Sequence, residues 1–152
     1  MTTTESRTDE LLVAHLLRRA GFGGTSAELS HLAQLDYEQA VDQLLDAIDS
    51  TSMPQDIIRR YHIDMSDLRT RPSSSGNWLY QMVNTDAPFV EKVNLFWHRV
   101  FATGQTKLIQ GKAMSTQLDM FRKYGLGSFD ELLLKLSKDP AMILWLDNQD
   151  NH

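Results

Sequence analysis

Residues that begin and end α-helices recur along the whole sequence. Pairs spaced as reciprocal N-terminal caps occur three times, at Thr25 and Glu28, Asp36 and Gln39, and Ser128 and Glu131. Between these signals apolar residues recur every three or four positions, and no stretch shows the alternation of a β-strand. The sequence therefore predicts an all-α fold, an irregular multi-helix bundle of about seven or eight helices with no substantial sheet.

The caps and breakers divide the chain into segments. Helices are expected from Thr8 to Ala20 and over residues 26–34, 36–48, 77–85, 89–102, 112–124 and 128–138, with a last one opened by Asp139 and Pro140. The run "GFGG" ends the first helix, with Gly21 or Gly23 in a left-handed conformation. Residues 50–76 hold two prolines and the run "SSSG", and this pattern predicts an irregular surface excursion.

The chain length and its last helix bear on domain organisation. A length of 152 residues fits a single helical domain. The final "DPAMILWLDNQDNH" contains a helix that is apolar nearly all round, and such a helix must be covered. The preceding helices could cover it, or 1–152 could be the N-terminal part of a longer protein. In the second case the cover over Ile143–Trp145 would be a missing C-terminal portion, a partner chain or another copy in a homo-oligomer.

Charge and composition exclude some classes of protein. The net charge of −5 gives no overall attraction to phosphate backbones, so no nucleic-acid partner is expected. There is no cysteine, which rules out disulfides and thiolate metal sites. No apolar run is long enough to span a membrane, and the polar first ten residues do not resemble a secretory signal. A soluble, cytoplasmic protein is expected.

The segment "EKVNLFWHRVFAT" at 91–103 raises the main functional question. On a helical projection its aromatic and valine side chains form one apolar face, expected to be core: Phe96, Trp97, Val100 and Phe101. Glu91, Asn94 and His98 form a polar strip along the border of that face. In one interpretation His98 and Glu91 are catalytic candidates, because a histidine near a carboxylate can move protons or bind a metal. In the other, the strip is buried and hydrogen-bonds neighbouring helices. The spacing matches no standard metal motif, and no metal site is predicted.

Other polar residues stand among apolar ones. His15 is a further catalytic candidate on the first helix, and Arg18 and Arg19 near its end favour a structural ion pair over an anion site. Gln117 shares a face with apolar residues, so it is expected to point inward and to need a partner. Asp147 and Asn148 follow the last apolar helix and are interpreted as capping or turn residues.

Three motifs in order, "HLLRRAGFG" at 15–23, "EKVNLFWHRVFAT" at 91–103 and "DPAMILWLDNQDN" at 139–151, resemble the bacterial family catalogued as domain of unknown function 1800. The resemblance implies a helical fold and no established activity. It also implies a longer protein, since the family pattern continues past the final asparagine. Many relatives look exported, and many carry a second histidine where this chain has Val100.

Two functions are consistent with these residues. The first is an uncharacterised helical protein that acts as the N-terminal scaffold or interaction portion of a larger protein, with its polar residues locking helices together. The second is a metal- or ligand-dependent enzyme domain whose site is built from the His98 helix and completed by residues beyond 152. The first requires His98 to be sealed with a bonded nitrogen, and the second requires a cavity with several convergent polar side chains.

Overall fold

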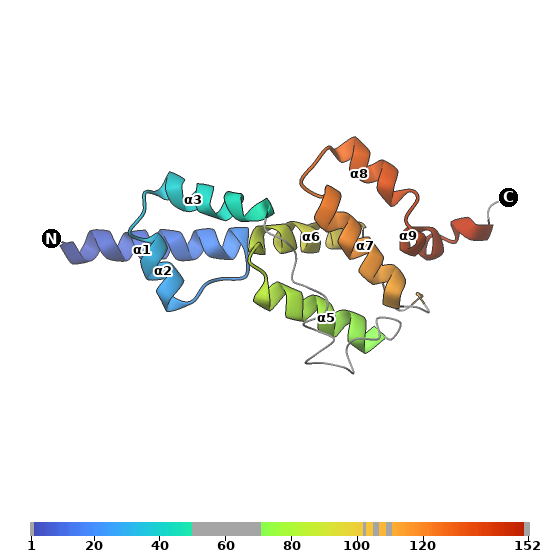
Figure 1. The fold of residues 1–152 in the computed structure, drawn as a ribbon, viewed down its shortest axis with the longest axis horizontal. Coiled ribbons are helices and arrows are strands. Elements are labelled where there is room, and N and C mark those ends of the chain that lie inside the picture. Colours follow the sequence, from blue (N-terminus) through green and yellow to red (C-terminus); the bar gives the residue numbers. More distant parts are fainter. Residues whose placement is uncertain (1, 50–70, 102, 105–106, 109–110, 151–152) are drawn as a thin grey trace. The chain divides into compact units, whose positions relative to one another are not determined.

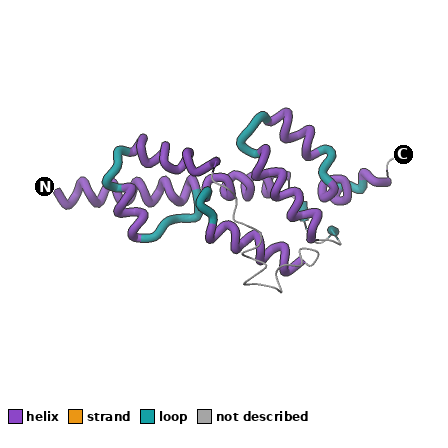
Figure 2. The backbone as a smooth tube through the Cα atoms, viewed as in Figure 1, coloured by secondary structure: helices purple, strands orange, loops and turns teal. Residues whose placement is uncertain are grey.

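The structure is a computed structural model that describes residues 2–49, 71–101, 103–104, 107–108 and 111–150. Over these residues the chain forms eight α-helices, two short 3-10 helices and no strand (Figures 1 and 2), which confirms the all-α prediction. The helices are α1 (Thr2–Ala20), α2 (Ser26–Leu32), α3 (Tyr37–Asp46), α5 (Arg71–Asn84), α6 (Pro88–Phe101), α7 (Gly111–Tyr124), α8 (Phe129–Leu136) and α9 (Pro140–Trp145). The 3-10 helices are η1 (Ala47–Asp49) and η3 (Asn148–Asp150). None of the described helices is long and apolar enough to cross a bilayer.

Most helix starts lie where the cap residues predicted them. The backbone N–H of Thr25 donates to Glu28 Oε2 at 2.6 Å, and the N–H of Glu28 donates to Thr25 Oγ1 at 3.3 Å. The N–H of Asp36 likewise donates to Gln39 Oε1 at 3.2 Å. Ser128 occupies the N-cap position of α8, although its side chain makes no capping hydrogen bond. These starts were predictable because a cap involves residues only three positions apart.

The first helix differs from its prediction at its N-terminal end. Helix α1 begins at Thr2 rather than at Thr8. The segment before Thr8 has no apolar residues after Met1, so it carries no periodic signal of a helix. At the other end the prediction holds, because Gly23 has a φ of 103° and its N–H donates to Leu17 O at 3.3 Å. Glycine accommodates this left-handed backbone without a steric penalty.

Helix α5 is the largest departure from the sequence prediction. The prediction of an irregular excursion is wrong for residues 71–76, which form the start of this helix; residues 50–70 lie outside the described part of the chain. Ser73 and Ser74 are buried, with 6% and 2% of their surface exposed. Serine and glycine are weak helix formers, so the helix depends on tertiary packing that local propensity does not reveal.

The chain folds into two compact units, each with its own hydrophobic core. The first consists of Met1–Ser52 with Thr85–Lys92, and the second of Met53–Asn84 with Val93–His152. That the two form a single domain, as the chain length indicates, stays a prediction. In the first unit α1 contacts both α2 and α3, and its core contains Val13, Leu17, Leu32 and Ala40.

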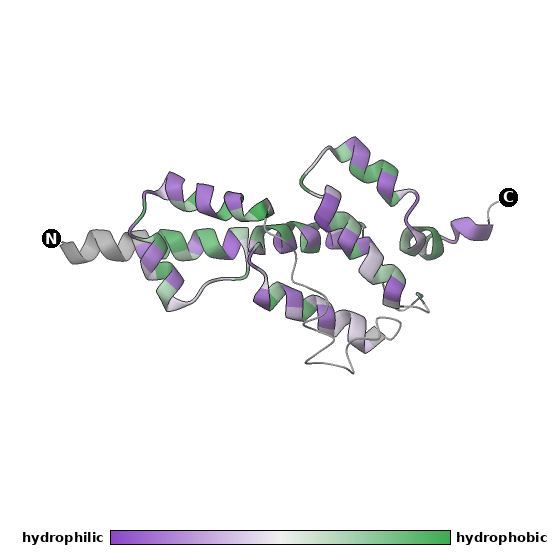
Figure 3. Cartoon of the chain, in the orientation of Figure 1, coloured by the Kyte–Doolittle hydropathy of each residue, from purple (hydrophilic) through white to green (hydrophobic). Residues whose placement is uncertain are grey.

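The second unit is organised around α7, which contacts α5, α8 and α9. Apolar residues of α7 and of its neighbours form two clusters, one with Leu108, Met114, Leu118 and Ala141 and the other with Phe121, Leu132, Leu136 and Met142. The hydropathy colouring in Figure 3 shows that α9 is apolar over most of its length, whereas η3 after it is polar. Because α7 lies between three helices, it carries inward-facing residues on more than one side.

Trp97 connects α6 to the loop after α7. Its ring stacks on Phe101 with centroids 5.7 Å apart and on Phe129 at 5.8 Å. Its Nε1 donates to the carbonyl oxygen of Gly125 at 2.7 Å. The predicted core face is therefore correct for Trp97 and Phe101. It is wrong for Phe96 and Val100, which are 55% and 50% exposed.

Candidate functional site

His98 lies beside a cavity of about 130 Å³ in the second unit. Its imidazole meets the Trp78 indole edge to face, with ring centroids 5.0 Å apart and planes at 85°. The residue is half-buried, and this burial lowers the pKa of the imidazole below its ordinary value. Burial therefore favours the neutral form of the imidazole. Its Nδ1 has no hydrogen-bond partner among the described residues.

Polar and apolar side chains share the wall of this cavity. The apolar part comes from Trp78 of α5 and from Met114 and Leu118 of α7. The polar part comes from Ser74 and Ser75 of α5, His98 of α6, and Thr103 just beyond α6. Thr103 is only 2% exposed, and its Oγ1 also has no hydrogen-bond partner within the described part of the chain. Two buried polar atoms without protein partners thus belong to residues of one cavity.

The sequence hypotheses anticipated only part of this arrangement. The scaffold hypothesis required a sealed His98 with one bonded nitrogen. The structure places His98 beside a cavity, with Nδ1 buried and without a partner among the described residues, and a bond to the other nitrogen stays a prediction. The sequence pattern predicts Ser74 in a surface excursion and Thr103 in a loop between two helices. No local pattern could have identified either, because what distinguishes them is burial against helices distant in sequence.

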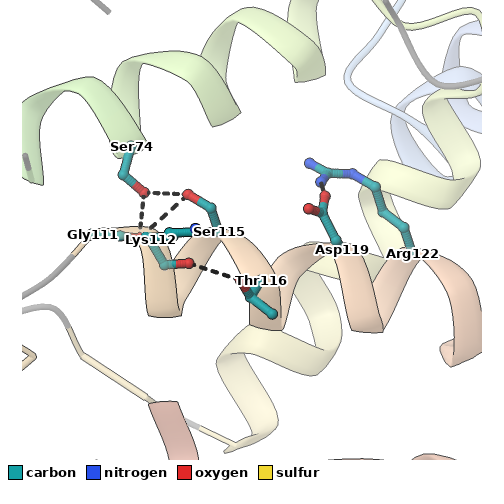
Figure 4. Close-up of polar contacts among 7 residues, drawn as sticks. All are labelled: Ser74, Gly111, Lys112, Ser115, Thr116, Asp119 and Arg122. Atoms are coloured by element: carbon teal, nitrogen blue, oxygen red, sulfur yellow. Dashed lines mark hydrogen bonds and ion pairs between the residues drawn. The ribbon is translucent and has the colours of Figure 1, made fainter. Parts of the chain in front are cut away.

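A second, narrower cleft lies between α5 and α7. Its volume is about 10 Å³, enough for one water molecule, and Ser74, Asn77, Gln81, Ser115 and Arg122 are among its lining residues. Figure 4 shows the hydrogen bonds at one end of it. The Ser74 hydroxyl donates to Gly111 O at 3.2 Å and lies 2.9 Å from Ser115 Oγ.

At the other end of the same view Arg122 Nη1 pairs with Asp119 Oδ1 at 2.6 Å. These two residues are three positions apart on α7, and the Asp119 side chain is 61% exposed. An exposed pair within one helix contributes little to stability. The buried Ser74 contacts, which join two helices, are the ones that position α5 against α7.

Gln117 has the inward orientation that its position predicted. It is fully buried, and its Nε2 donates to Asp139 Oδ1 at 2.7 Å. The same oxygen accepts the N–H of Met142 at 3.0 Å, so Asp139 caps α9 as expected. Burial raises the pKa of the Asp139 carboxyl, and the hydrogen bonds from Met142, Gln117 and Ala141 oppose this rise.

The other two residues of the polar strip are buried on α6. Glu91 is 4% exposed and belongs to the first unit, whereas Asn94 is fully buried and belongs to the second unit with His98. Packing therefore decides the position of Glu91 and Asn94, in agreement with the scaffold hypothesis. His15 is exposed on α1 in the first unit.

The remaining candidates lie on the surface. Arg18 and Arg19 are exposed in the last turn of α1, and their ion pair stays a prediction. Asp147 has a φ of 57° just beyond α9 and forms an ion pair with Lys107 Nζ at 2.5 Å. Lys107 also donates to Trp145 O at 2.9 Å, and together these contacts hold the chain after α9. Asn148 is exposed at the start of η3. Where the structure describes the chain, no three His, Asp or Glu side chains are grouped so that they could hold a metal ion.

Comparison with known proteins agrees with this helical architecture. A family model described as "Protein of unknown function (DUF1800)" matches residues 15–152. Neither the curated proteins nor the solved structures compared with the chain gave a match. The matched region includes His98 and every other residue of its cavity. The family resemblance of the three sequence motifs is thereby confirmed, and the chain belongs to the DUF1800 family of proteins of unknown function.

Proposed function

We propose that the chain acts as a helical scaffold, the interaction portion of a larger protein, to which further protein packs through apolar helix faces. The observation that carries this proposal is the number of large apolar side chains left in solvent on well-formed helices. Monomeric soluble proteins rarely expose contiguous apolar patches beyond a few hundred Å², and larger ones mark interaction surfaces.

Two of these faces lie in the second unit. On α5, Leu79 is 61% exposed and Val83 is 81% exposed, and their spacing of four residues places them on one side of the helix. On α6, Phe96 and Val100 have the same spacing and are 55% and 50% exposed. On each helix, two exposed apolar side chains one turn apart could contact the same partner.

The C-terminal helices add to this surface. Phe129 and Leu133 of α8 are exposed and four residues apart. On α9, Leu144 is 39% exposed, whereas Ile143 and Trp145 are half-buried. This supports the expectation that the apolar region around Ile143–Trp145 is covered by a partner chain, a second copy or further polypeptide.

Side-chain hydrogen bonds between different helices and loops also support the scaffold role. Trp97 binds the carbonyl of Gly125, and Gln117 binds Asp139 across α7 and the start of α9. Buried polar contacts of this kind fix one arrangement of helices, because any shift would leave a desolvated group unpaired. Helices held in this way present their outer faces in a constant geometry.

The test is sedimentation velocity combined with binding of a hydrophobic dye, on the whole chain. A monomer that binds dye, or a dimer that does not, supports the proposal, because both show an apolar surface that needs cover. The double variant Leu79→Ser, Val83→Ser should reduce dye binding or dimerisation without lowering the free energy of unfolding. Lys112→Ser, on the exposed side of α7, is the matched control. A wild-type monomer that binds no dye would overturn the proposal.

Cytoplasmic location and the lack of nucleic-acid partners remain predictions from composition and charge. One observation supports the enzyme alternative, the cavity beside His98.

A further inference from the structure

We propose that the outer face of α8, defined by Asp130, Leu134 and Lys138, is a homodimer interface on which the same face of a second copy packs antiparallel. The inference rests on the proposed scaffold role, because it names the partner for one of the exposed apolar faces. The dimer would have a two-fold axis near Leu134. Each residue before Leu134 would then meet a residue after it in the other copy.

The centre of this face and its border are apolar. Leu134 is 55% exposed, and its neighbours Leu133 and Phe129 are 39% and 53% exposed. The Phe129 ring stacks on Trp97 with centroids 5.8 Å apart, and Trp97 meets Phe96 of α6 edge to face at 4.9 Å. Phe96 is also exposed, so the apolar surface continues from α8 to α6 within the second unit.

The helical path of α8 extends as far as Lys138. The backbone N–H groups of Ser137 and Lys138 donate to Leu133 O and Lys135 O at 2.9 and 3.2 Å. Asp130 and Lys138 therefore lie one turn before and one turn after Leu134, about 6 Å away along the helix on either side. Asp130 and Lys138 are both exposed.

The charges on this face identify a second copy as the partner. In an antiparallel pair centred on Leu134, Asp130 of each copy lies opposite Lys138 of the other. The two-fold axis makes this contact twice, so the face is complementary to itself. A parallel pair would instead place like charges together at both ends, which is unfavourable.

The size of the face sets the expected affinity. Specific interfaces usually bury about 1,200–2,000 Å² in total, and weak or transient ones bury less. An interface centred on an eight-residue helix belongs to the small class. We therefore expect a reversible dimer with a Kd of about 1–100 µM.

The experiment is sedimentation equilibrium of the whole chain at concentrations of about 5–200 µM, a range that spans the expected Kd. Wild type should dimerise. Leu134→Ser should raise the dimer Kd about tenfold or more, because both copies lose a buried apolar side chain. Asp130→Lys and Lys138→Glu should each raise it about fivefold or more, since two like-charge contacts replace two ion pairs.

Mixing the two charge variants tests the pairing itself. In an equimolar mixture of Asp130→Lys with Lys138→Glu, opposite charges face each other again at both ends of the mixed dimer. The mixture should therefore dimerise with a Kd within about twofold of wild type, which also shows that neither variant is misfolded. Glu38→Lys is the matched control, because Glu38 is the second residue of α3, as Asp130 is of α8, and is exposed in the first unit.

Three results would overturn this inference. One is a dimer whose Kd changes no more in the α8 variants than in Glu38→Lys, because the copies would then meet elsewhere. Another is a mixture of the charge variants that stays as monomeric as its components. The third is a wild-type chain that is monomeric at about 200 µM, well above the expected Kd. Dye binding by that monomer would leave the scaffold role standing, whereas a monomer without dye binding would overturn both.

Discussion

Asp139 Oδ1 accepts two hydrogen bonds at once, from Gln117 Nε2 at 2.7 Å and from the backbone N–H of Met142 at 3.0 Å. One atom therefore caps α9 and joins it to the middle of α7. Gln117 is fully buried and Asp139 is 5% exposed, so neither partner can exchange this contact for water. This acceptor and the apolar contacts of Ala141 and Met142 hold α9 in position in the second unit.

Asp139→Ala should lower the free energy of unfolding by about 1–3 kcal/mol, because it removes the cap and leaves the Gln117 amide unpaired. Asp139→Asn retains an oxygen acceptor and removes the buried charge, so it should stay within about 1 kcal/mol of wild type. Urea titration of the three proteins measures the difference. Equal losses in the two variants would show that the carboxylate charge, rather than the acceptor, matters.

Gly125→Ala should destabilise the second unit. A Cβ at this position would lie 2.8 Å from Trp97 Cδ1 and against the carbonyl oxygen of Phe121. Relieving that overlap would shift the backbone or the indole, at a cost of about 1–3 kcal/mol. Gly127→Ala is the matched control, because a Cβ there would meet only Tyr124 O at 3.4 Å, an ordinary contact. Thermal unfolding that ranks the two variants in the opposite order would disprove this account of Gly125.

Ser74→Ala should cost about 1 kcal/mol of stability, because it removes the hydroxyl that binds Gly111 O and Ser115 Oγ between α5 and α7. Thr116→Ala removes a hydroxyl that binds Lys112 O within α7 at an exposed position, and it should stay within about 0.5 kcal/mol. Both are measured by chemical denaturation. A Ser74→Ala protein as stable as wild type would mean that α5 is held to α7 by apolar contacts alone.

The stability of the chain should depend on the protonation of His98. Burial lowers the pKa of this imidazole in the folded state, so between that value and about 6.5 the unfolded chain binds a proton that the folded chain does not. Stability is therefore complete above pH 6.5 and falls as the pH decreases below it. Urea midpoints at pH 7.5 and 5.5 measure this loss. His98→Asn should show a smaller loss between the two pH values, and an unchanged loss would assign it to other groups.

How much of this structure is predictable depends on the range of the interactions involved. The caps at Thr25, Asp36 and Asp139 use partners three residues away, and all three helix starts are where the sequence indicates. The start of α5 was missed because Ser74 is stabilised by Gly111 and Ser115, which lie in another helix. Local propensity has no information about such a partner.

Helix α6, which carries His98, also shows that local spacing is predictable whereas contacts with distant helices are not. Its apolar and polar residues are helically spaced as predicted, but the projection does not reveal which sides have neighbours. Asn94 is buried and Phe96 is exposed, the reverse of what their hydrophobicity suggests. The cavity wall joins residues 74, 98, 103 and 118, and no pattern of adjacent residues could have indicated it.

The contact of Trp78 with His98 and the stacking of Trp97 on Phe101 give the chain two optical reporters in different surroundings. The indole beside the imidazole reports changes around His98, and the other reports changes in the aromatic cluster. With Trp145 and one of the other two tryptophans replaced by phenylalanine, fluorescence can distinguish a change beside His98 from loosening of the aromatic cluster. The protein therefore needs no attached dye to report which of the two has changed.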